Sequence, residues 1–164
     1  MVKNMVCDTN IWLVRAGKNG EYEDYFINEK IVGIPFNLGK EVIFTDDYRE
    51  LKRFIQKNNL DLKTPQLTSK VFTITSRMKI GDYVLIPSKK KHNEYYIGII
   101  KSDCTYSPDN CIMPFRRSVS FSPSMISKES FEYNTRNSLG SLLSIFKIPA
   151  NEKLLMMLNS IITK

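Results

Sequence analysis

Two apolar stretches joined by a short basic turn dominate the hydrophobic pattern of the chain. They span residues 82–87 (DYVLIP) and 95–101 (YYIGIIK), and both are rich in Val, Ile, Leu and Tyr. Such residues fit a pleated, buried surface, so the pattern predicts a β-hairpin. Neither stretch alternates strictly between apolar and polar positions, which predicts that both faces are at least partly covered. Gly98 in the second stretch indicates a bulge, a bend or a closely approaching backbone.

Three consecutive lysines, Lys89, Lys90 and Lys91, occupy the predicted hairpin turn. A run of like charge at an exposed tip is typical of a strand edge that is kept soluble. The alternative is a basic finger that contacts phosphates. The hairpin taken alone favours the first interpretation.

The rest of the pattern predicts more strands and several short helices. Strands are expected over residues 11–16, 31–36 and 112–121, and helices over residues 21–28, 46–57, 66–78 and 150–163, with a brief helix from Ser127. Asp46 or Asp47 is expected to cap the second of these helices. Residues 105–110 are expected to form a polar loop. The leucines, Ile145 and Phe146 of segment 136–148 are expected to pack.

The first predicted strand places Trp12 and Val14 on one face and Leu13 and Arg15 on the other, because side chains alternate along a strand. The whole pattern contains about five strands spread among short helices, and neighbouring strands are often joined by tight turns. It predicts an α+β fold, in the form of a small, strongly bent sheet or open barrel with helices on its outside.

The charge of the chain points to a polyanionic partner. A length of 164 residues suits one domain with an appended element. Lys and Arg outnumber Asp and Glu by 24 to 17, which gives a net charge of +7. Excess positive charge on a small domain favours binding to nucleic acid, although it also serves solubility.

The sequence offers little for metal or membrane chemistry. Cys7, Cys104 and Cys111 are odd in number and lack CxxC spacing, and the one histidine, His92, lies in the basic turn. No zinc set of reasonable spacing can be assembled from them, and reduced thiols are expected. No signal peptide and no apolar run of membrane-spanning length are visible. We therefore expect a cytoplasmic protein with no metal, no cofactor and no membrane partner.

Seven sequence blocks, in this order, carry a resemblance to a known family. They are WLVRAG at 12–17, GE at 20–21, IVGI at 31–34, MKIGD at 78–82, YIG at 96–98, RRSV at 116–119 and RNSLGS at 136–141. Over about residues 11–148 they resemble the N-terminal modified-base reader of Mrr-type, modification-dependent restriction endonucleases. That module is similar to the EVE, YTH and SRA domains of the PUA-like superfamily. WLVRAG and RNSLGS are fairly specific, whereas KxGD with YIG is shared by many PUA-like barrels.

The resemblance implies a PUA-like bent β-barrel of about five to six strands, with flanking helices. It implies a module without catalytic residues that holds an extruded, often methylated base in an aromatic pocket. Residues 1–148 would form this reader domain, and residues 149–164 a C-terminal helix or a linker to a missing effector domain. The expected partner is modified duplex DNA, with RNA as the alternative, together with a fused or separate nuclease effector.

The chain departs from the full-length pattern because it has no room for the nuclease. Residues 61–63 carry the letters D-x-K of PD-(D/E)xK enzymes, with Asp46 or Asp47 upstream. They lie in a short polar connector rather than on an apolar strand, so the match is interpreted as chance. A small metal-dependent nuclease is the last of the alternatives.

A base reader needs aromatic faces, polar groups that read a base edge, and cations for the backbone. The aromatic candidates for the base pocket are Trp12, Tyr22, Phe36 and Tyr83, and the polar candidates are Asn19, Asp24 and Ser88. The candidates for contacts with the nucleic-acid backbone are Arg15, Lys89, Lys90, Lys91, Arg116, Arg117 and Arg136. Trp12 also fits a plain core position, Asp24 a solvated helix face, and Arg15 an ion pair with Glu21 or Glu23.

Overall fold

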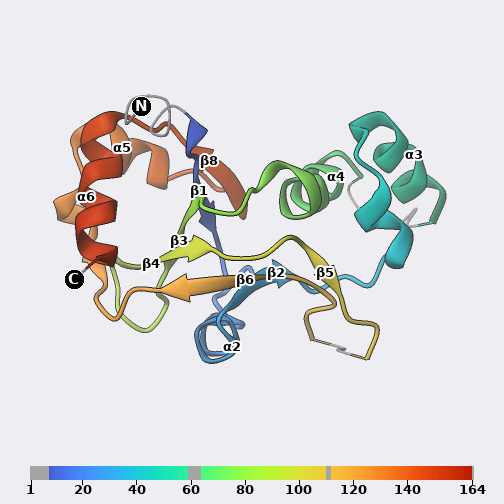
Figure 1. Ribbon diagram of the computed structural model, residues 1–164, viewed down its shortest axis with the longest axis horizontal. Helices are drawn as coiled ribbons and strands as arrows, with labels where there is room; N and C mark the ends of the chain where they lie inside the picture. Colours follow the sequence, from blue (N-terminus) through green and yellow to red (C-terminus); the bar gives the residue numbers. More distant parts are fainter. Residues whose placement is uncertain (1–7, 59–63, 110–111, 164) are drawn as a thin grey trace.

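The computed structural model describes residues 8–58, 64–109 and 112–163. The predicted α+β fold is confirmed, because one strongly bent sheet runs through the molecule with helices on both sides (Figure 1). No helix in these ranges is long and apolar enough to cross a membrane.

The sheet is built around the predicted hairpin. Its strands follow the order β2-β6-β4-β3-β1-β8, with bounds β1 Ile11–Val14, β2 Ile31–Ile34, β3 Tyr83–Pro87, β4 Glu94–Ile100, β6 Phe115–Phe121 and β8 Ile145–Ile148. Two short strands, β5 Thr105–Tyr106 and β7 Ile126–Ser127, pair with β6 and β4. The pairing of β1 with β3 is parallel, and the other pairings are antiparallel.

Gly98 of β4 lies where side chains of β6 approach closely, whereas the sequence predicted a bulge, a bend or a closely approaching backbone. A Cβ atom built at this position would lie 2.3 Å from Cγ1 of Val119 on β6. The missing side chain therefore lets β6 pack against β4 at this point.

The sheet separates two hydrophobic cores, so the prediction that both faces of the hairpin are covered is confirmed. Trp12 and Val14 of β1 face the first core, and Ile11 and Leu13 face the second, as strand alternation requires. The first core is closed by the helices α2 Glu23–Glu29, α3 Tyr48–Asn58 and α4 Thr64–Phe72. The second is closed by α5 Tyr133–Leu139 and α6 Glu152–Ile162, which lie at the opposite end of the molecule from α3 (Figure 1).

Local side-chain chemistry explains several helix boundaries. The carboxylate of Asp47 accepts hydrogen bonds from the backbone amides of Arg49 (2.8 Å) and Glu50 (3.2 Å), which confirms the predicted cap of α3. The helix predicted over residues 66–78 stays regular only as far as Phe72 and continues as a π-helical turn, Thr73–Arg77. Thr73 starts a β-branched run there, which strains a regular helix.

The carboxyl-terminal third differs from the prediction in one important way. Segment 136–148 contains the end of α5, an exposed loop and the strand β8, which pairs with β1. Leu142 is 98% exposed and Leu143 56% exposed, so the expectation that these two leucines pack is wrong. They lie in the loop before β8. By contrast, the predicted terminal helix forms as α6 and packs Leu154, Leu155 and Leu158 on the second core. The short strand β5 also replaces the start of the loop expected at 105–110.

Candidate functional site

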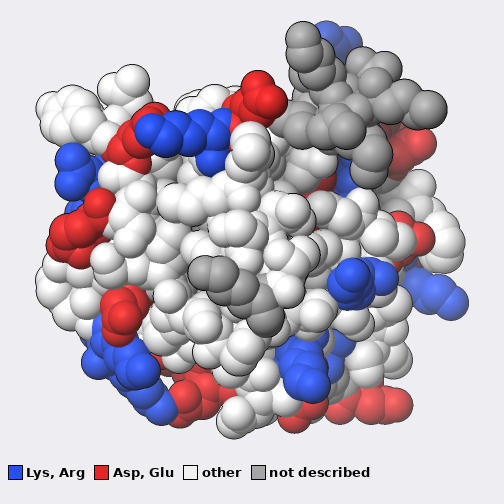
Figure 2. All heavy atoms as spheres, turned by 60° about the vertical axis from the view of Figure 1, so that its left-hand side comes forward, with Lys and Arg blue, Asp and Glu red and all other residues white. Residues whose placement is uncertain are grey.

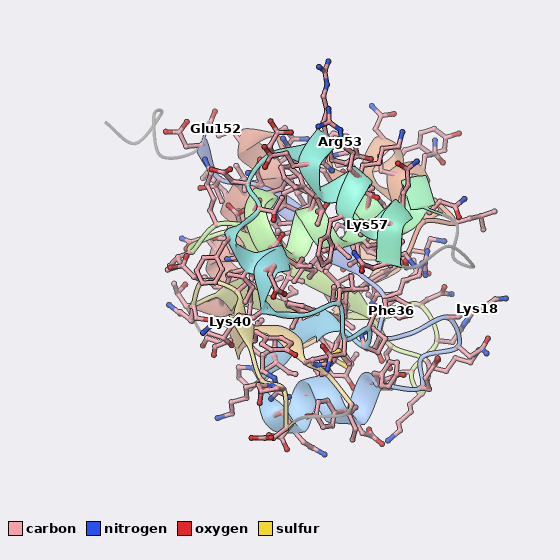
Figure 3. All side chains as sticks on the ribbon, turned by 90° about the vertical axis from the view of Figure 1, so that its right-hand side faces the viewer. Lys18, Phe36, Lys40, Arg53, Lys57 and Glu152 are labelled. Carbon is pink, nitrogen blue, oxygen red and sulfur yellow. The ribbon has the colours of Figure 1, made fainter. Side chains whose placement is uncertain are left out.

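A cleft of about 670 Å³ opens where β1, β2, α4 and the loop before β8 meet. We call this cavity the cleft, and its lining residues come from five segments of the chain. They are Arg15, Gly17, Lys18, Glu21, Tyr22, Phe26, Gly33, Ile34, Pro35, Phe36, Gln66, Lys70, Leu142, Leu143, Ser144 and Ile145. Two of the four predicted pocket aromatics, Tyr22 and Phe36, are thus brought together with the predicted cation Arg15. Figure 3 shows Phe36 between α3 and α2, with Lys18 extending outward at the edge.

Tyr22 and Phe36 offer half-buried aromatic surface at the cleft. Both pack against the first core while remaining partly exposed. Tyr22 stands immediately before α2, at the end of a turn in which Gly17 (φ 84°) and Gly20 (φ 72°) adopt left-handed backbone conformations. Phe36 follows β2 directly after Pro35. Two aromatic groups in this setting can stack on a planar ligand.

Arg15 fixes the loop that forms the far wall of the cleft. Its Nη2 donates to the carbonyl oxygen of Ser141 (2.7 Å) and its Nε to that of Leu143 (3.2 Å). Its backbone amide donates to the carbonyl oxygen of Ser144 (2.8 Å). The suggested ion pairs with Glu21 or Glu23 do not form, because both carboxylates bind other groups. The main structural role of Arg15 is therefore to hold the loop before β8 in place. Its positive charge nevertheless lies at the cleft, because Arg15 is one of the lining residues.

The ionisable groups of the cleft are mostly basic. Lys18 is exposed, and Lys70 on α4 is half-buried, which lowers its pKa through loss of hydration. Among the described lining residues, Glu21 is the one carboxylate. Hydrogen bonds from its own amide and that of Asn19 lower the pKa of Glu21, so it stays ionised. The exposed side of the cleft thus combines two lysines with one fixed negative charge.

Trp12 lies behind the cleft, in the first core. It is 5% exposed, and its indole Nε1 donates to the carboxylate of Asp82 at 2.9 Å. The same carboxylate accepts from the backbone amides of Asn10 (3.1 Å) and Lys79 (3.0 Å). The WLVRAG and KIGD blocks are therefore joined by a buried polar contact. Trp12 does not line the cleft, although it lines a neighbouring cavity of about 560 Å³.

Tyr83 lies on the opposite face of the sheet. It belongs to the second core, where its hydroxyl donates to Asn159 of α6 at 3.5 Å, and burial raises its pKa. The structure does not bring it to the cleft, because its position on β3 alternates with that of Val84, which faces the first core.

The basic turn is held by a buried carboxylate that sequence reasoning did not single out. Glu23 of α2 accepts hydrogen bonds from Ser88 Oγ (2.7 Å), the Tyr96 hydroxyl (2.9 Å) and the backbone amides of Lys89 and Lys90. Burial raises the pKa of Glu23, but these hydrogen bonds outweigh it and bring the pKa below its usual value. The hydroxyl of Ser88, which was a candidate for reading the base, therefore donates its hydrogen bond to Glu23 within the fold.

This anchor brings the basic turn next to the turn that precedes α2. A Cβ atom on Gly20 would lie 2.7 Å from Cβ of Lys89. Lys90 forms an ion pair with Asp24 at 2.5 Å. Lys89 therefore lies close to the cleft mouth, whereas Asp24, Ser88 and the side chain of Asn19 are not among the lining residues.

Among the predicted backbone contacts on β6 and α5, the prediction for Arg117 is wrong. It is 3% exposed and donates to the carbonyl oxygens of Ile74, Thr75 and Ser102, so its guanidinium is enclosed and no phosphate reaches it. Arg116 projects from the other face of β6 and donates to the hydroxyl of Tyr25 (2.9 Å). Arg136 lies on α5 and is not among the residues that line the cleft.

Most residues that line the cleft were not among the predicted site residues, and Gln66, Lys70, Leu142 and Ser144 are examples. The loop that carries Leu142 and Ser144 directly follows the RNSLGS block, which was the available signal. The hydroxyl oxygen of Ser144 is buried, and no described residue hydrogen-bonds to it. Within the described ranges no group of three His, Cys, Asp or Glu side chains is placed to hold a metal ion. The D-x-K letters at 61–63, Cys7 and Cys111 lie outside these ranges.

Comparisons with known proteins give a family but no activity. A family model described as "Domain of unknown function (DUF8426)" matches residues 12–148, which include the cleft and, apart from Ile11 of β1, all the strands described above. The solved structure of a hypothetical protein from Leishmania major is similar at 14% identity over 94% of this chain and 98% of that chain, with a TM-score of 0.42. This likeness is too weak to carry an argument. No curated protein matches.

Proposed function

We propose that this chain, which belongs to the DUF8426 family, is a non-catalytic module that binds nucleic acid and holds one extruded, modified base of DNA in the cleft. It would act in the cytoplasm as the specificity part of a restriction or defence system, beside a fused or separate nuclease. The observation that carries the proposal is the cleft itself, which is lined by the half-buried aromatic residues Tyr22 and Phe36 together with Arg15, Lys18 and Lys70.

The energetics of base extrusion suit this cleft. Taking a base out of the stack costs a few kcal/mol, and each aromatic face that stacks on it returns about 1–3 kcal/mol. A volume of about 670 Å³ falls within the range of roughly 300–1,000 Å³ that is usual for small-ligand pockets. Tyr22 and Phe36 would offset the extrusion, and the apolar wall of Ile34, Leu143 and Ile145 would contact an added methyl group.

Two polar groups in the cleft are suited to reading the base. The carboxylate of Glu21 can accept from an exocyclic amino group, and the amide of Gln66 can pair with adenine. They take the role that the sequence had suggested for Asn19 and Asp24. The net charge of +7 supports a polyanionic partner for the same surface.

Fluorescence anisotropy with matched oligonucleotides tests the proposal. Duplexes that are identical except for one 5-methylcytosine or one N6-methyladenine are compared with the plain duplex and with RNA of the same sequence. Phe36→Ala should weaken binding of the preferred modified duplex by roughly 5- to 150-fold, the equivalent of about 1–3 kcal/mol. The matched control is Phe44→Ala, because Phe44 is 72% exposed and lies outside the cleft.

Each contrary result removes a defined part of the proposal. Equal affinity for modified and plain duplexes would end the claim of modification reading. Tighter binding of RNA would favour an RNA-binding PUA-like module, which is the second candidate. An equal effect of Phe36→Ala and Phe44→Ala would show that the base does not enter the cleft.

A further inference from the structure

The cleft continues along β8 into two further cavities. The next cavity, of about 200 Å³, is lined by Gln66, Ser69, Lys70, Leu143, Ser144 and Ile145, and five of these six residues also line the cleft. The third cavity, of about 560 Å³, shares Ser69, Leu143 and Ile145 with the second. The three cavities therefore form one path between α4 and β8, which lie side by side in Figure 1. We call the second and third cavities together the β8 groove.

The ionisable side chains that line the β8 groove are all basic. They are Lys70, Arg77, Lys79 and Lys147, and no Asp or Glu is among the described lining residues. Hydroxyl groups are interspersed with them, at Ser69, Thr73, Ser76 and Ser144. The face over α5 and α6 differs, because acidic and basic side chains alternate there (Figure 2).

The four cations keep their charge available to a ligand. The two ion pairs seen among the described side chains, Lys90–Asp24 and Lys153–Glu132, involve none of them. Arg77 donates instead to the neutral hydroxyls of Thr73 (3.3 Å) and Ser69 (3.4 Å). Its guanidinium also lies over the rings of Tyr48 and Phe72, 5.6 and 5.1 Å from their centroids. Arg77 is thus oriented without being neutralised, which suits the binding of an anion.

We infer that the β8 groove holds the sugar–phosphate backbone of the single strand that flanks the base in the cleft. The inference rests on the proposed function and adds a direction to it, because the groove leaves the cleft on one side only, past Leu143 and Ile145. Lys70, Arg77, Lys79 and Lys147 contact successive phosphates along this path. An aromatic site that opens into a cationic groove is the arrangement that binds single-stranded nucleic acid.

Two exposed lysines of the groove provide the test. The double variant Lys79→Gln/Lys147→Gln is compared with Lys40→Gln/Lys57→Gln, which removes the same charge from exposed lysines outside the three cavities (Figure 3). Binding is measured between 50 and 300 mM salt, about the range over which phosphate contacts dominate. The probes are single-stranded oligonucleotides that carry the modified base at the centre, at the 5′ end or at the 3′ end.

In the wild type, removal of the flank on one side should weaken binding, and removal of the other flank should not. In the groove variant this dependence should disappear. The slope of log K against log salt should become less negative by about 1.4, which is 0.7 for each of the two lost phosphate contacts. The ratio of affinities for modified and plain bases should stay unchanged, because the cleft is intact.

The contrary outcomes separate the inference from the proposed function. If both double variants behave alike while the modified base is still preferred, the groove inference is overturned and the base-reading proposal stands. If polyglutamate competes as well as the oligonucleotide at equal ionic strength, the groove binds acidic peptide and the inference is again overturned. If the wild type binds no oligonucleotide, both fall together.

Discussion

Replacing Glu23 by Gln should destabilise the protein more than any other isosteric change of a carboxylate on α2. Glu23 is buried, and its two carboxylate oxygens accept four hydrogen bonds from the basic turn and β4. Two of the donors are hydroxyls, of Ser88 and Tyr96, and two are backbone amides. The contact joins α2 to a hairpin that lies about seventy residues away, so it closes the first core at this end.

The size of the effect follows from these bonds. A hydrogen bond to a charged group contributes about 1.5–3 kcal/mol, and a buried donor left unpaired costs about 1–3 kcal/mol. Gln keeps one acceptor oxygen but presents an NH₂ group to donors on the other side. The two backbone amides share one oxygen of Glu23 and the two hydroxyls share the other, so the Gln oxygen can stay against the amides while the hydroxyls rotate to accept from its NH₂ group. The loss then comes from replacing four hydrogen bonds to a charged group by neutral ones, which contribute about 0.5–1.5 kcal/mol each. We therefore expect Glu23→Gln to lower the free energy of unfolding by about 2–4 kcal/mol at neutral pH.

The effect should depend on pH in a defined direction. The folded-state pKa of Glu23 lies below its usual value of 4.5, so ionised Glu23 stabilises the fold fully above pH 4.5. This contribution is lost as the pH falls through the lower, folded-state pKa. The stability difference between the wild type and Glu23→Gln should therefore be constant near neutrality and shrink below pH 4.5.

Urea unfolding followed by fluorescence measures both quantities, because Trp12 is the only tryptophan and is buried. Glu29→Gln is the matched control, since Glu29 belongs to the same helix and is exposed. A loss below about 0.5 kcal/mol for Glu23→Gln, within the usual range of surface substitutions, would refute the reasoning. So would a stability difference that grows as the pH falls.

Two further predictions concern the sheet and the lip of the cleft. Gly98→Ala should lower the free energy of unfolding by about 1–3 kcal/mol through overpacking, because the new methyl group meets Val119; an unchanged thermal midpoint would contradict this. Leu142→Ser should leave stability unchanged, since Leu142 is 98% exposed. It should weaken binding of a modified duplex but not of the same single strand, because an apolar wedge helps to open a base step. Anisotropy with both probes measures this, and equal losses would contradict it.

Much of the fold could be predicted because it depends on neighbours in the sequence. Alternation along β1 placed Trp12 and Leu13 on opposite faces, and these faces are the two cores. The apolar density of residues 82–101 predicted a hairpin covered on both sides, and Asp47 identified the start of α3. Strand β8 was missed because its residues IFKI follow two leucines, which together look like one packed segment.

The cleft itself could not be predicted from the sequence, which supplied Arg15, Tyr22 and Phe36 as candidates but also supplied Trp12, Tyr83 and Arg117. The local sequence pattern determines which residues share a face of a strand or helix, because the direction of a side chain depends on backbone geometry over only a few positions. Which face receives a cavity depends on the parallel pairing of β1 with β3 and on the return of β8 beside β1. These contacts join segments some 70 and 130 residues apart. They turned Tyr83 toward α6, enclosed Arg117 among carbonyl oxygens, and left Leu142 at the lip of the cleft.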